Sequence, residues 1–385
     1  MEIKRLTAEH YDALLALLNE TFGNKAGKPV DFLSVQPKMW VRDDEHMRCH
    51  FGVFEDGRLC AVVGIYPLRT VIDGTPFLFA TTGNVATHPD YEGRGYFNLL
   101  FTEVMKELEA IGADAGRLGG LRQRYGRFGY EGCGVSYLFL FGPKNRIRCF
   151  GEKAGADIIF TPIDREDTET LAFCRELRMR SPIYVERPSD NDYRDVYLSL
   201  CSKYCKPYLA TRDGKPVGYL CAADEGKSVH ELEAPDVDAF RDIVCGWQAK
   251  CGRDIDLAIP AFNVEQIRLL CATAESYRVT YPSRFKILNW QGITDATMRL
   301  GAKTAPMLDG EFVLKIEGYG TIRLFVRDGK AGCERTDAAP ELTLDRLAAA
   351  RLLFGPTDPI SVADLPPIPR SWLPLPFSWG AMDAI

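Results

Sequence analysis

One short stretch of the sequence has residue types that suit the binding of a phosphate group. It runs from Asn84 to Asn98 and places Gly93 and Gly95 on either side of Arg94, between an apolar run and an amphipathic segment. The first N–H groups of a helix lack partners and carry partial positive charge, so a glycine turn before a helix predicts a pyrophosphate site. The order is neither GxGxxG nor GxxxxGK[ST], which argues against a Rossmann site and a P-loop. A ligand-free strand, loop and helix would look similar, and Arg94 would then be a surface charge.

A second stretch combines arginines with aromatic residues and glycines. It reads Arg122-Gln123-Arg124-Tyr125-Gly126-Arg127-Phe128-Gly129-Tyr130-Glu131. The three arginines are a possible anion patch, but we expect at least two of them to be solvated surface charges. A tyrosine that ends an aromatic run is more often part of a core than a catalytic group, so this pattern alone leaves the role of Tyr130 open.

Length and composition are those of an ordinary globular protein of two or three domains. The chain has 385 residues, of which 46% are apolar and 26% charged. A formal charge of −6 disfavours a nucleic-acid partner and favours a cationic substrate. The first residues lack the apolar segment of a signal peptide, and no apolar run is as long as a membrane span. We therefore expect a cytoplasmic protein with no membrane partner.

The cysteines and histidines predict neither disulfides nor a metal centre. There are twelve cysteines and five histidines. Neither Cys201 with Cys205 nor Cys245 with Cys251 forms a C-x-x-C pair, and no histidine lies beside them. We expect reduced, buried cysteines and no structural metal.

The elements that would position the glycine turn follow from hydrophobic periodicity. Strands are predicted near 2–6, 50–55, 58–65, 69–72 and 77–87, with Asp-Gly hairpin turns at 56–57 and 73–74. A helix follows the first strand, and another begins at Tyr96 and carries Leu100, Val104 and Leu108 on one face. A weak strand at 115–121 and a strong strand at 135–141 are predicted to close this first domain.

The rest of the chain divides into two further parts. Residues 208–220 repeat the strand, Asp-Gly turn and strand of the first domain, and a helix is predicted at 237–250. Ala234-Pro235-Asp236 precedes that helix without glycines, which makes a good cap and a poor pyrophosphate site. Such hairpins are common, so the repeat could also be coincidental. Three strands near 310–336 and a helix at 344–354 form the last part. The proline-rich tail carries Trp372, Phe377 and Trp379, so we expect it to pack on the body.

The glycine turn resembles the coenzyme A turn of the GCN5-related N-acetyltransferases (the GNAT superfamily), whose pattern is Q/R-x-x-G-x-G/A. That pattern falls on Glu92-Gly93-Arg94-Gly95-Tyr96-Phe97. Glu92 and Phe97 depart from it. The resemblance implies that acetyl-CoA is the cosubstrate. The coenzyme contacts it implies are Val85, Ala86, Thr87, Gly93, Arg94, Gly95, Tyr96, Phe97 and Asn98.

With the R-Y-G-R-F-G-Y segment and the later domains, the whole chain resembles the enhanced-intracellular-survival (Eis) type of acetyltransferase. This implies an α/β (α+β) fold: tandem GNAT domains at 1–145 and 146–283, the second degenerate, followed by a sterol-carrier-protein-like domain at 284–385. It also implies a homo-oligomer that transfers acetyl to a primary amine of a cationic small molecule or a lysine side chain. Tyr130 would be the general acid and the terminal carboxylate of Ile385 the base, although the family usually ends in an aromatic residue.

Other functions fit parts of the sequence. A non-enzymatic acyl-CoA sensor or lipid carrier would use the last domain, and transfer of a peptidyl or longer acyl group is a further enzymatic alternative. The identity of the acceptor amine does not follow from the sequence.

Overall fold

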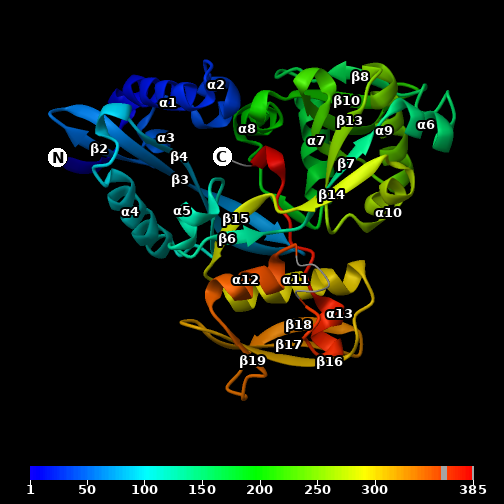
Figure 1. Ribbon diagram of the computed structural model, residues 1–385. Coiled ribbons are helices and arrows are strands. Elements are labelled where there is room, and N and C mark those ends of the chain that lie inside the picture. The colour runs from blue at the N-terminus through cyan, green and yellow to red at the C-terminus, as the bar shows by residue number, and fades with distance from the viewer. Residues whose placement is uncertain (357–361, 384–385) are drawn as a thin grey trace.

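The computed structural model describes residues 1–356 and 362–383. Two α/β halves lie side by side, and a smaller part built from later residues lies beneath them (Figure 1). The end of the chain runs from the lower part up into the space between the two halves. The expected α/β fold with mainly antiparallel sheets is confirmed.

The first half is built on an eight-stranded sheet in the order β1-β2-β3-β4-β5-β15-β6, with β9 paired to the far end of β3. Its antiparallel meander ends in β4, which runs parallel to β5. The strands are β1 (Glu2–Arg5), β2 (His50–Glu55), β3 (Arg58–Ile72), β4 (Thr75–Thr87), β5 (Ala115–Leu118), β6 (Glu131–Cys133), β9 (Ile183–Val185) and β15 (Ser283–Ile287).

Helices cover both faces of this sheet. α1 (Tyr11–Ala26) packs Leu14 and Leu18 on one face, and α4 (Tyr96–Ala110) packs Leu100 and Val104 on the other. The helical spacing of these apolar residues explains why each helix buries one side. Short helices complete this half: α2 (Phe32–Val35), α3 (Asp44–Met47) and α5 (Arg122–Gly126), with the 3₁₀ segments η1 (Ala8–His10), η2 (Pro37–Met39) and η3 (Pro89–Tyr91).

The second half has a sheet of the same design, in the order β14-β7-β13-β12-β11-β10-β8. Here β12 runs parallel to β13, as β4 does to β5, and α9 (Val237–Cys251) follows β12 as α4 follows β4. The strands are β7 (Ser136–Phe141), β8 (Ile159–Pro162), β10 (Lys206–Arg212), β11 (Lys215–Ala223), β12 (Ser228–Glu233), β13 (Ile255–Pro260) and β14 (Ser276–Thr280). The other elements are α6 (Pro143–Phe150), α7 (Thr168–Met179), α8 (Asp190–Leu200), α10 (Val264–Thr273), η4 (Ser202–Tyr204) and η5 (Asp224–Gly226).

The two halves exchange a strand. β7 follows β6 in the chain but lies between β13 and β14 of the second sheet. In return, β15 follows β14 in the chain but lies between β5 and β6 of the first sheet. The prediction that the strand at 135–141 closes the first domain is therefore wrong. Its unbroken run of apolar residues fits the interior of either sheet, so the local pattern does not identify its neighbours.

A smaller correction concerns β3. The sequence predicted two strands at 58–65 and 69–72, whereas the structure has one continuous strand through Pro67. The proline fits because β2 pairs only as far as Gly64 and β9 pairs only from Thr70, so no neighbour on that side needs its missing N–H.

The last part of the chain packs α11 (Trp290–Thr304) and α12 (Arg346–Phe354) on a four-stranded sheet. The remaining elements are β16 (Gly310–Ile316), β17 (Gly320–Arg327), β18 (Lys330–Arg335), β19 (Leu342–Leu344), α13 (Pro367–Trp372) and η6 (Ala381–Asp383). Trp372, Phe377 and Trp379 are all buried, and Trp379 stacks on Phe79 of β4 with ring centroids 5.3 Å apart. The predicted packing of the tail is confirmed.

None of the described helices is both long and apolar enough to cross a membrane. Within residues 1–356 and 362–383, no three His, Cys, Asp or Glu side chains group in a way that could hold a metal ion.

Candidate active site

The glycine turn leads directly into α4. Gly93 and Gly95 have φ of 79° and 81°, a region that disfavours residues with a Cβ, and Gly95 is the N-cap of the helix. A Cβ built on either glycine would meet nothing within 4 Å, so the space above the turn is open. No side chain caps this helix. The first N–H groups of α4 therefore face an open surface that suits an anion.

Arg94 does not extend freely from this turn. Its guanidinium forms an ion pair with Glu55 at 2.9 Å and lies over the ring of Tyr91. The hydroxyl of Tyr96 donates to the other oxygen of Glu55. Arg94 is half exposed and can reach a phosphate only in competition with Glu55, a residue that the sequence analysis did not single out.

Strands β4 and β5 part just before this turn. Their parallel pairing ends at Thr82 and Leu118, which leaves one edge of β4 open over its last five residues. On the opposite edge the His88 N–H donates to the Cys60 carbonyl, in register with the pair Ala86 and Val62. Strand alternation then directs the backbone groups of Ala86 toward β3 and those of Val85 and Thr87 toward the open edge.

A bulge in β4 marks the place where the strands part. Asn84 has a φ of 54° and donates from Nδ2 to the Tyr66 hydroxyl, which in turn lies 2.6 Å from Nε2 of His50. Burial lowers the pKa of His50 to about 4, so its ring is neutral at pH 7. The Asn84 Oδ1 has no partner among the described residues. This buried network fixes the bulge and leaves one acceptor free.

Tyr130 lies on the α4 face of the same region. Its side chain is fully buried, and its ring packs on Phe101 of α4. The hydroxyl is so close to β5 that a Cβ built on Gly116 would lie 2.5 Å from it. The Thr82 hydroxyl lies beside it, close enough to lower the Tyr130 pKa slightly, but the two do not form a well-aligned hydrogen bond, and neither has another partner in the described chain. Burial raises the Tyr130 pKa far above its usual range, so the group keeps its proton at neutral pH.

These features converge on an anion-binding helix terminus, an open strand edge and unpartnered polar groups. The model of the acetyltransferase (GNAT) domain family matches residues 2–133. The first half contains a GNAT acetyltransferase domain. The domain is that of an acyl-transferring enzyme.

Solved structures resemble the whole chain. A GCN5-related N-acetyltransferase from Kribbella flavida is 19% identical with a TM-score of 0.64, over 100% of this chain and 98% of that one. A GCN5-related N-acetyltransferase from Anabaena variabilis is 16% identical with a TM-score of 0.66, over 98% of each chain. Eis1 from Mycobacterium abscessus is 16% identical with a TM-score of 0.67, over 100% of each chain. At these identities the likeness shows the fold. Curated proteins give no match to the sequence.

The remaining predicted contacts of the GNAT domain lie around α4. The ring of Phe97 stacks on Phe101, and the Asn98 side chain accepts a hydrogen bond from Arg127. Arg122, Arg124 and Arg127 are exposed, as predicted for at least two of them. Both Phe97 and Asn98 are thus held beside the turn by their own chain.

The described part of the tail ends against the second half, where η6 packs on β12, α8 and η4. Asp383 is fully buried, 3.0 Å from Nε of Arg187, and Arg187 also forms an ion pair with Glu231 of β12 at 2.7 Å. Burial opposes the negative charge of Asp383, but the positive charges of Arg187 and Arg178 outweigh burial and lower the Asp383 pKa to about 2. The predicted base, the terminal carboxylate of Ile385, lies outside the described residues. Asp383 itself is too well paired to act as a base.

Proposed function

We propose that this chain is an acetyl-CoA-dependent N-acetyltransferase with one coenzyme site, in the GNAT domain. The observation that carries the proposal is the uncapped start of α4 behind Gly93 and Gly95, next to the open edge of β4. Pyrophosphate would lie on the first N–H groups of α4. The pantetheine arm would extend along the backbone groups of Val85 and Thr87 as an added strand.

In the proposed reaction a neutral amine attacks the thioester carbonyl directly. The C–N bond forms, the C–S bond breaks, and the thiolate takes the phenolic proton of Tyr130. The terminal carboxylate of Ile385 accepts the proton that the amine loses. The buried Tyr130 hydroxyl keeps its proton and has no well-aligned partner beyond the neighbouring Thr82 hydroxyl, which supports its role as acid because a buried donor gains from a partner that a ligand supplies.

The acceptor is a primary amine, of a cationic small molecule or a lysine side chain. We further propose the three domains 1–145, 146–283 and 284–385, with β7 and β15 exchanged between the first two, and a sterol-carrier-like last domain. An Eis-like homo-oligomer in the cytoplasm is part of the same proposal.

The decisive test measures both coenzyme binding and acetyl transfer. Calorimetry with coenzyme A should give one site per chain, and acetyl transfer to a panel of polyamines and aminoglycosides should release one thiol per acetylated amine. A C-terminal extension replaces the terminal carboxylate with an amide, and it should reduce turnover without abolishing coenzyme binding. Two coenzyme sites, or full turnover in the extended protein, would contradict the one-site scheme or the role of Ile385.

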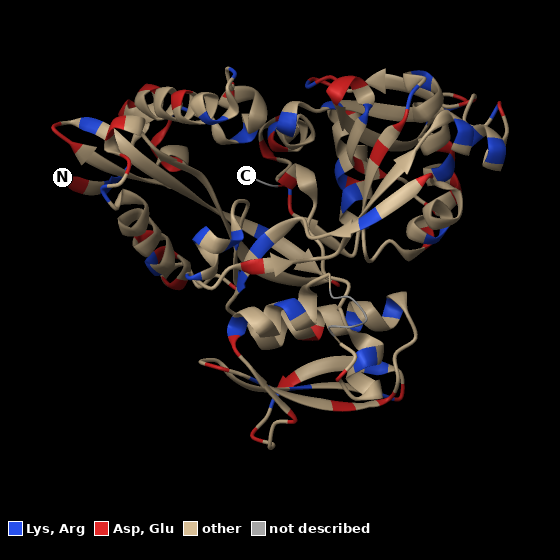
Figure 2. Cartoon of the chain, in the orientation of Figure 1, with Lys and Arg blue, Asp and Glu red and all other residues tan. Residues whose placement is uncertain are grey.

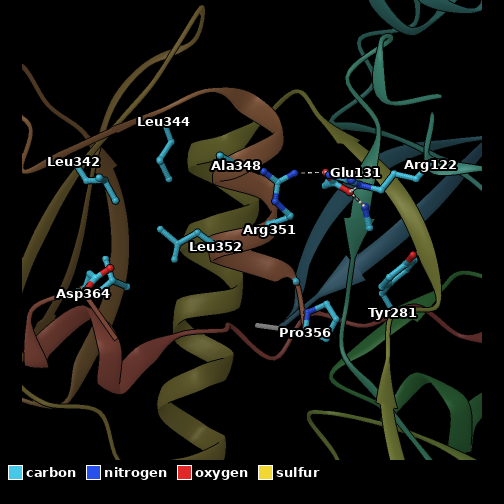
Figure 3. A pocket seen from close by; sticks show the side chains of 13 residues that line it. Arg122, Glu131, Tyr281, Leu342, Leu344, Ala348, Arg351, Leu352, Pro356 and Asp364 are labelled. Atoms are coloured by element: carbon cyan, nitrogen blue, oxygen red, sulfur yellow. Dashed lines mark hydrogen bonds and ion pairs between the residues drawn. The ribbon is translucent and has the colours of Figure 1, made fainter. Parts of the chain in front are cut away.

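A second function, that of a lipid or acyl-CoA carrier, is favoured by one observation. A cavity of about 530 Å³ lies between the GNAT domain and the last part of the chain (Figure 3). Leu342, Leu344 and Leu352 line its apolar side, and Glu131 at its other side forms ion pairs with Arg122 and Arg351. A carrier would retain a fluorescent fatty acid in this cavity and acetylate no amine.

A further inference from the structure

A second cavity lies between the two α/β halves, where the tail enters. It has a volume of about 330 Å³ and is lined from the first sheet by Arg117, from the second half by Lys203 and Glu233, and from the tail by Trp379. This volume is at the lower end of the range for small-molecule sites. Lys and Arg residues lie on both sides of the space that the tail enters (Figure 2).

Arg117 is the unusual group in this lining. Only 3% of its surface is exposed, and its guanidinium hydrogen-bonds to one side chain, the neutral hydroxyl of Ser283, at 2.6 and 2.9 Å. Its Nη1 has no partner among the described residues. A buried charge without a counter-charge is strongly unfavourable, so this guanidinium is a position at which an anion would be stabilised.

Neighbouring buried arginines show how this protein pairs such charges. Arg178 forms an ion pair with Glu233 at 2.7 Å, and Arg187 forms ion pairs with Glu231 at 2.7 Å and Asp383 at 3.0 Å. These carboxylates are therefore already paired. Asp383 stabilises the charge of Arg117 from a distance, but none of the three forms an ion pair with it. In the described chain, Arg117 is the buried arginine of this region that lacks an ion pair.

A further cation of the lining adds to the imbalance. Lys203 lines the same cavity, and burial together with the charge of Arg117 lowers its pKa to about 8. The cavity thus presents two cations whose charge no ion pair balances among the described residues.

Arg117 is also adjacent to the reacting region. It lies between Gly116, against which the Tyr130 hydroxyl packs, and Leu118, the last residue of β5 that pairs with β4. Because side chains alternate along a strand, Arg117 projects from the face opposite to Tyr130, toward the tail. Arg117 is thus one residue away from the point at which β4 and β5 part, next to the open edge of β4.

We propose that the acceptor carries a carboxylate as well as an amine, and that Arg117 binds this carboxylate in the cavity between the halves. The substrate class is thus an amino acid or the carboxyl-terminal lysine of a peptide. This proposal rests on the proposed acetyltransferase activity, which supplies the reason for an amine. The carboxylate site itself is inferred from the burial of Arg117 and from its lack of an ion pair among the described residues.

Binding to the full chain without acetyl-CoA tests the site independently of catalysis. The probes are 4-aminobutanoate and 6-aminohexanoate, each compared with butylamine or hexylamine, which have the same amine and chain length but no carboxylate. A hydrogen-bonded charge pair contributes about 1.5–3 kcal/mol, so the amino acids should bind at least about 10-fold more tightly and raise Tm more.

Three variants assign the preference to Arg117. Arg117→Met should abolish the preference for amino acids over alkylamines. Arg117→Lys should retain part of this preference because a cation remains. Arg165→Met removes an exposed arginine of the second half and should leave it unchanged. Without ligand, Arg117→Met should have a Tm equal to or above that of the native protein, since it removes a buried unpaired charge.

The outcomes separate this proposal from the proposed function. Equal binding of amino acids and alkylamines by the native chain overturns the carboxylate site, even if Arg117→Met fails to fold. A preference that appears only after C-terminal extension also overturns it, because the chain's own terminal carboxylate would then be the anion on Arg117. Amino acids that bind with the expected preference but are never acetylated would instead contradict the acetyltransferase activity.

Discussion

The two halves contain sheets of the same design. They differ in what fills the gap that opens where the two parallel strands of each sheet part. In the first half, pairing ends at Thr82, and Asn84, two residues on, has an acceptor without a partner in the described chain. In the second half, pairing ends at Val229, and both oxygens of Glu231, two residues on, accept hydrogen bonds from Arg187. The second gap is filled by ion pairs that the tail completes through Asp383.

The helices that follow the two gaps differ in the same way. α4 begins at Gly95 without a side-chain cap, whereas the Asp236 carboxylate caps α9 by accepting from the Ala239 N–H at 2.8 Å. A carboxylate at that place satisfies an N–H group and repels a phosphate. One fold thus serves as a ligand site where its polar groups are left free and as a scaffold where they are paired.

The largest expected effect comes from breaking the ion pairs of the second gap. Asp383→Asn leaves Arg187 with one counter-charge fewer, and should lower the free energy of unfolding by about 3–5 kcal/mol at pH 7. The folded pKa of about 2 lies below the ordinary 3.8, so the stabilisation is present above pH 4 and is lost as pH falls toward 2. Urea titrations of both proteins from pH 2 to pH 7 measure this. Asp213→Asn, at an exposed hairpin turn, should change stability by less than about 0.5 kcal/mol.

Tyr130→Phe tests whether the free hydroxyls of the first gap do chemistry. It removes a buried hydroxyl with little change in packing, and should lower kcat by roughly 100-fold while coenzyme affinity stays nearly constant. The control is Tyr277→Phe on β14, an exposed tyrosine of the second sheet, which should leave kcat unchanged. Native turnover in Tyr130→Phe would remove this residue from the mechanism.

Gly95→Asp gives the first helix the kind of residue that caps the second. A carboxylate at this position would meet the pyrophosphate, and like charges in contact should weaken coenzyme A binding by about 10-fold or more. Gly252→Asp at the end of α9 shares the positive φ and the open surroundings, without the anion site. Calorimetry should show weaker binding in the first variant alone; an equal loss in both would point to backbone strain.

Asp236→Ala is the converse change and should have the smallest effect. Loss of the cap should cost about 1 kcal/mol of stability, measured by thermal unfolding. Coenzyme stoichiometry should remain one per chain, because the preceding residues supply no glycine turn. A second binding site in this variant would show that the cap alone separates the two halves.

Local features of the GNAT domain and of the tail were predictable from the sequence. The glycine turn, the apolar face of α4 and the burial of Trp372, Phe377 and Trp379 all depend on neighbouring residues, and each is present. The coenzyme and catalytic roles given to residues of this region remain predictions.

Features that join distant residues were not predictable. The exchange of β7 and β15 depends on pairing between strands far apart in the chain, which hydrophobic alternation does not specify. The network of His50, Tyr66 and Asn84 likewise brings together residues from three strands. Arg117 gave no signal, because a single arginine in a weak, glycine-rich strand looks like a surface residue.

The exchange of strands also affects how the chain is made. Residues 131–133 of the first sheet leave the ribosome about 150 residues before 283–287, the strand that fills the place between them and β5. At about 5–20 residues per second, translation needs roughly 8–30 s to supply it. During that interval β5 and β6 lack the strand that lies between them, and unpaired strand edges of this kind are sites at which another chain can add.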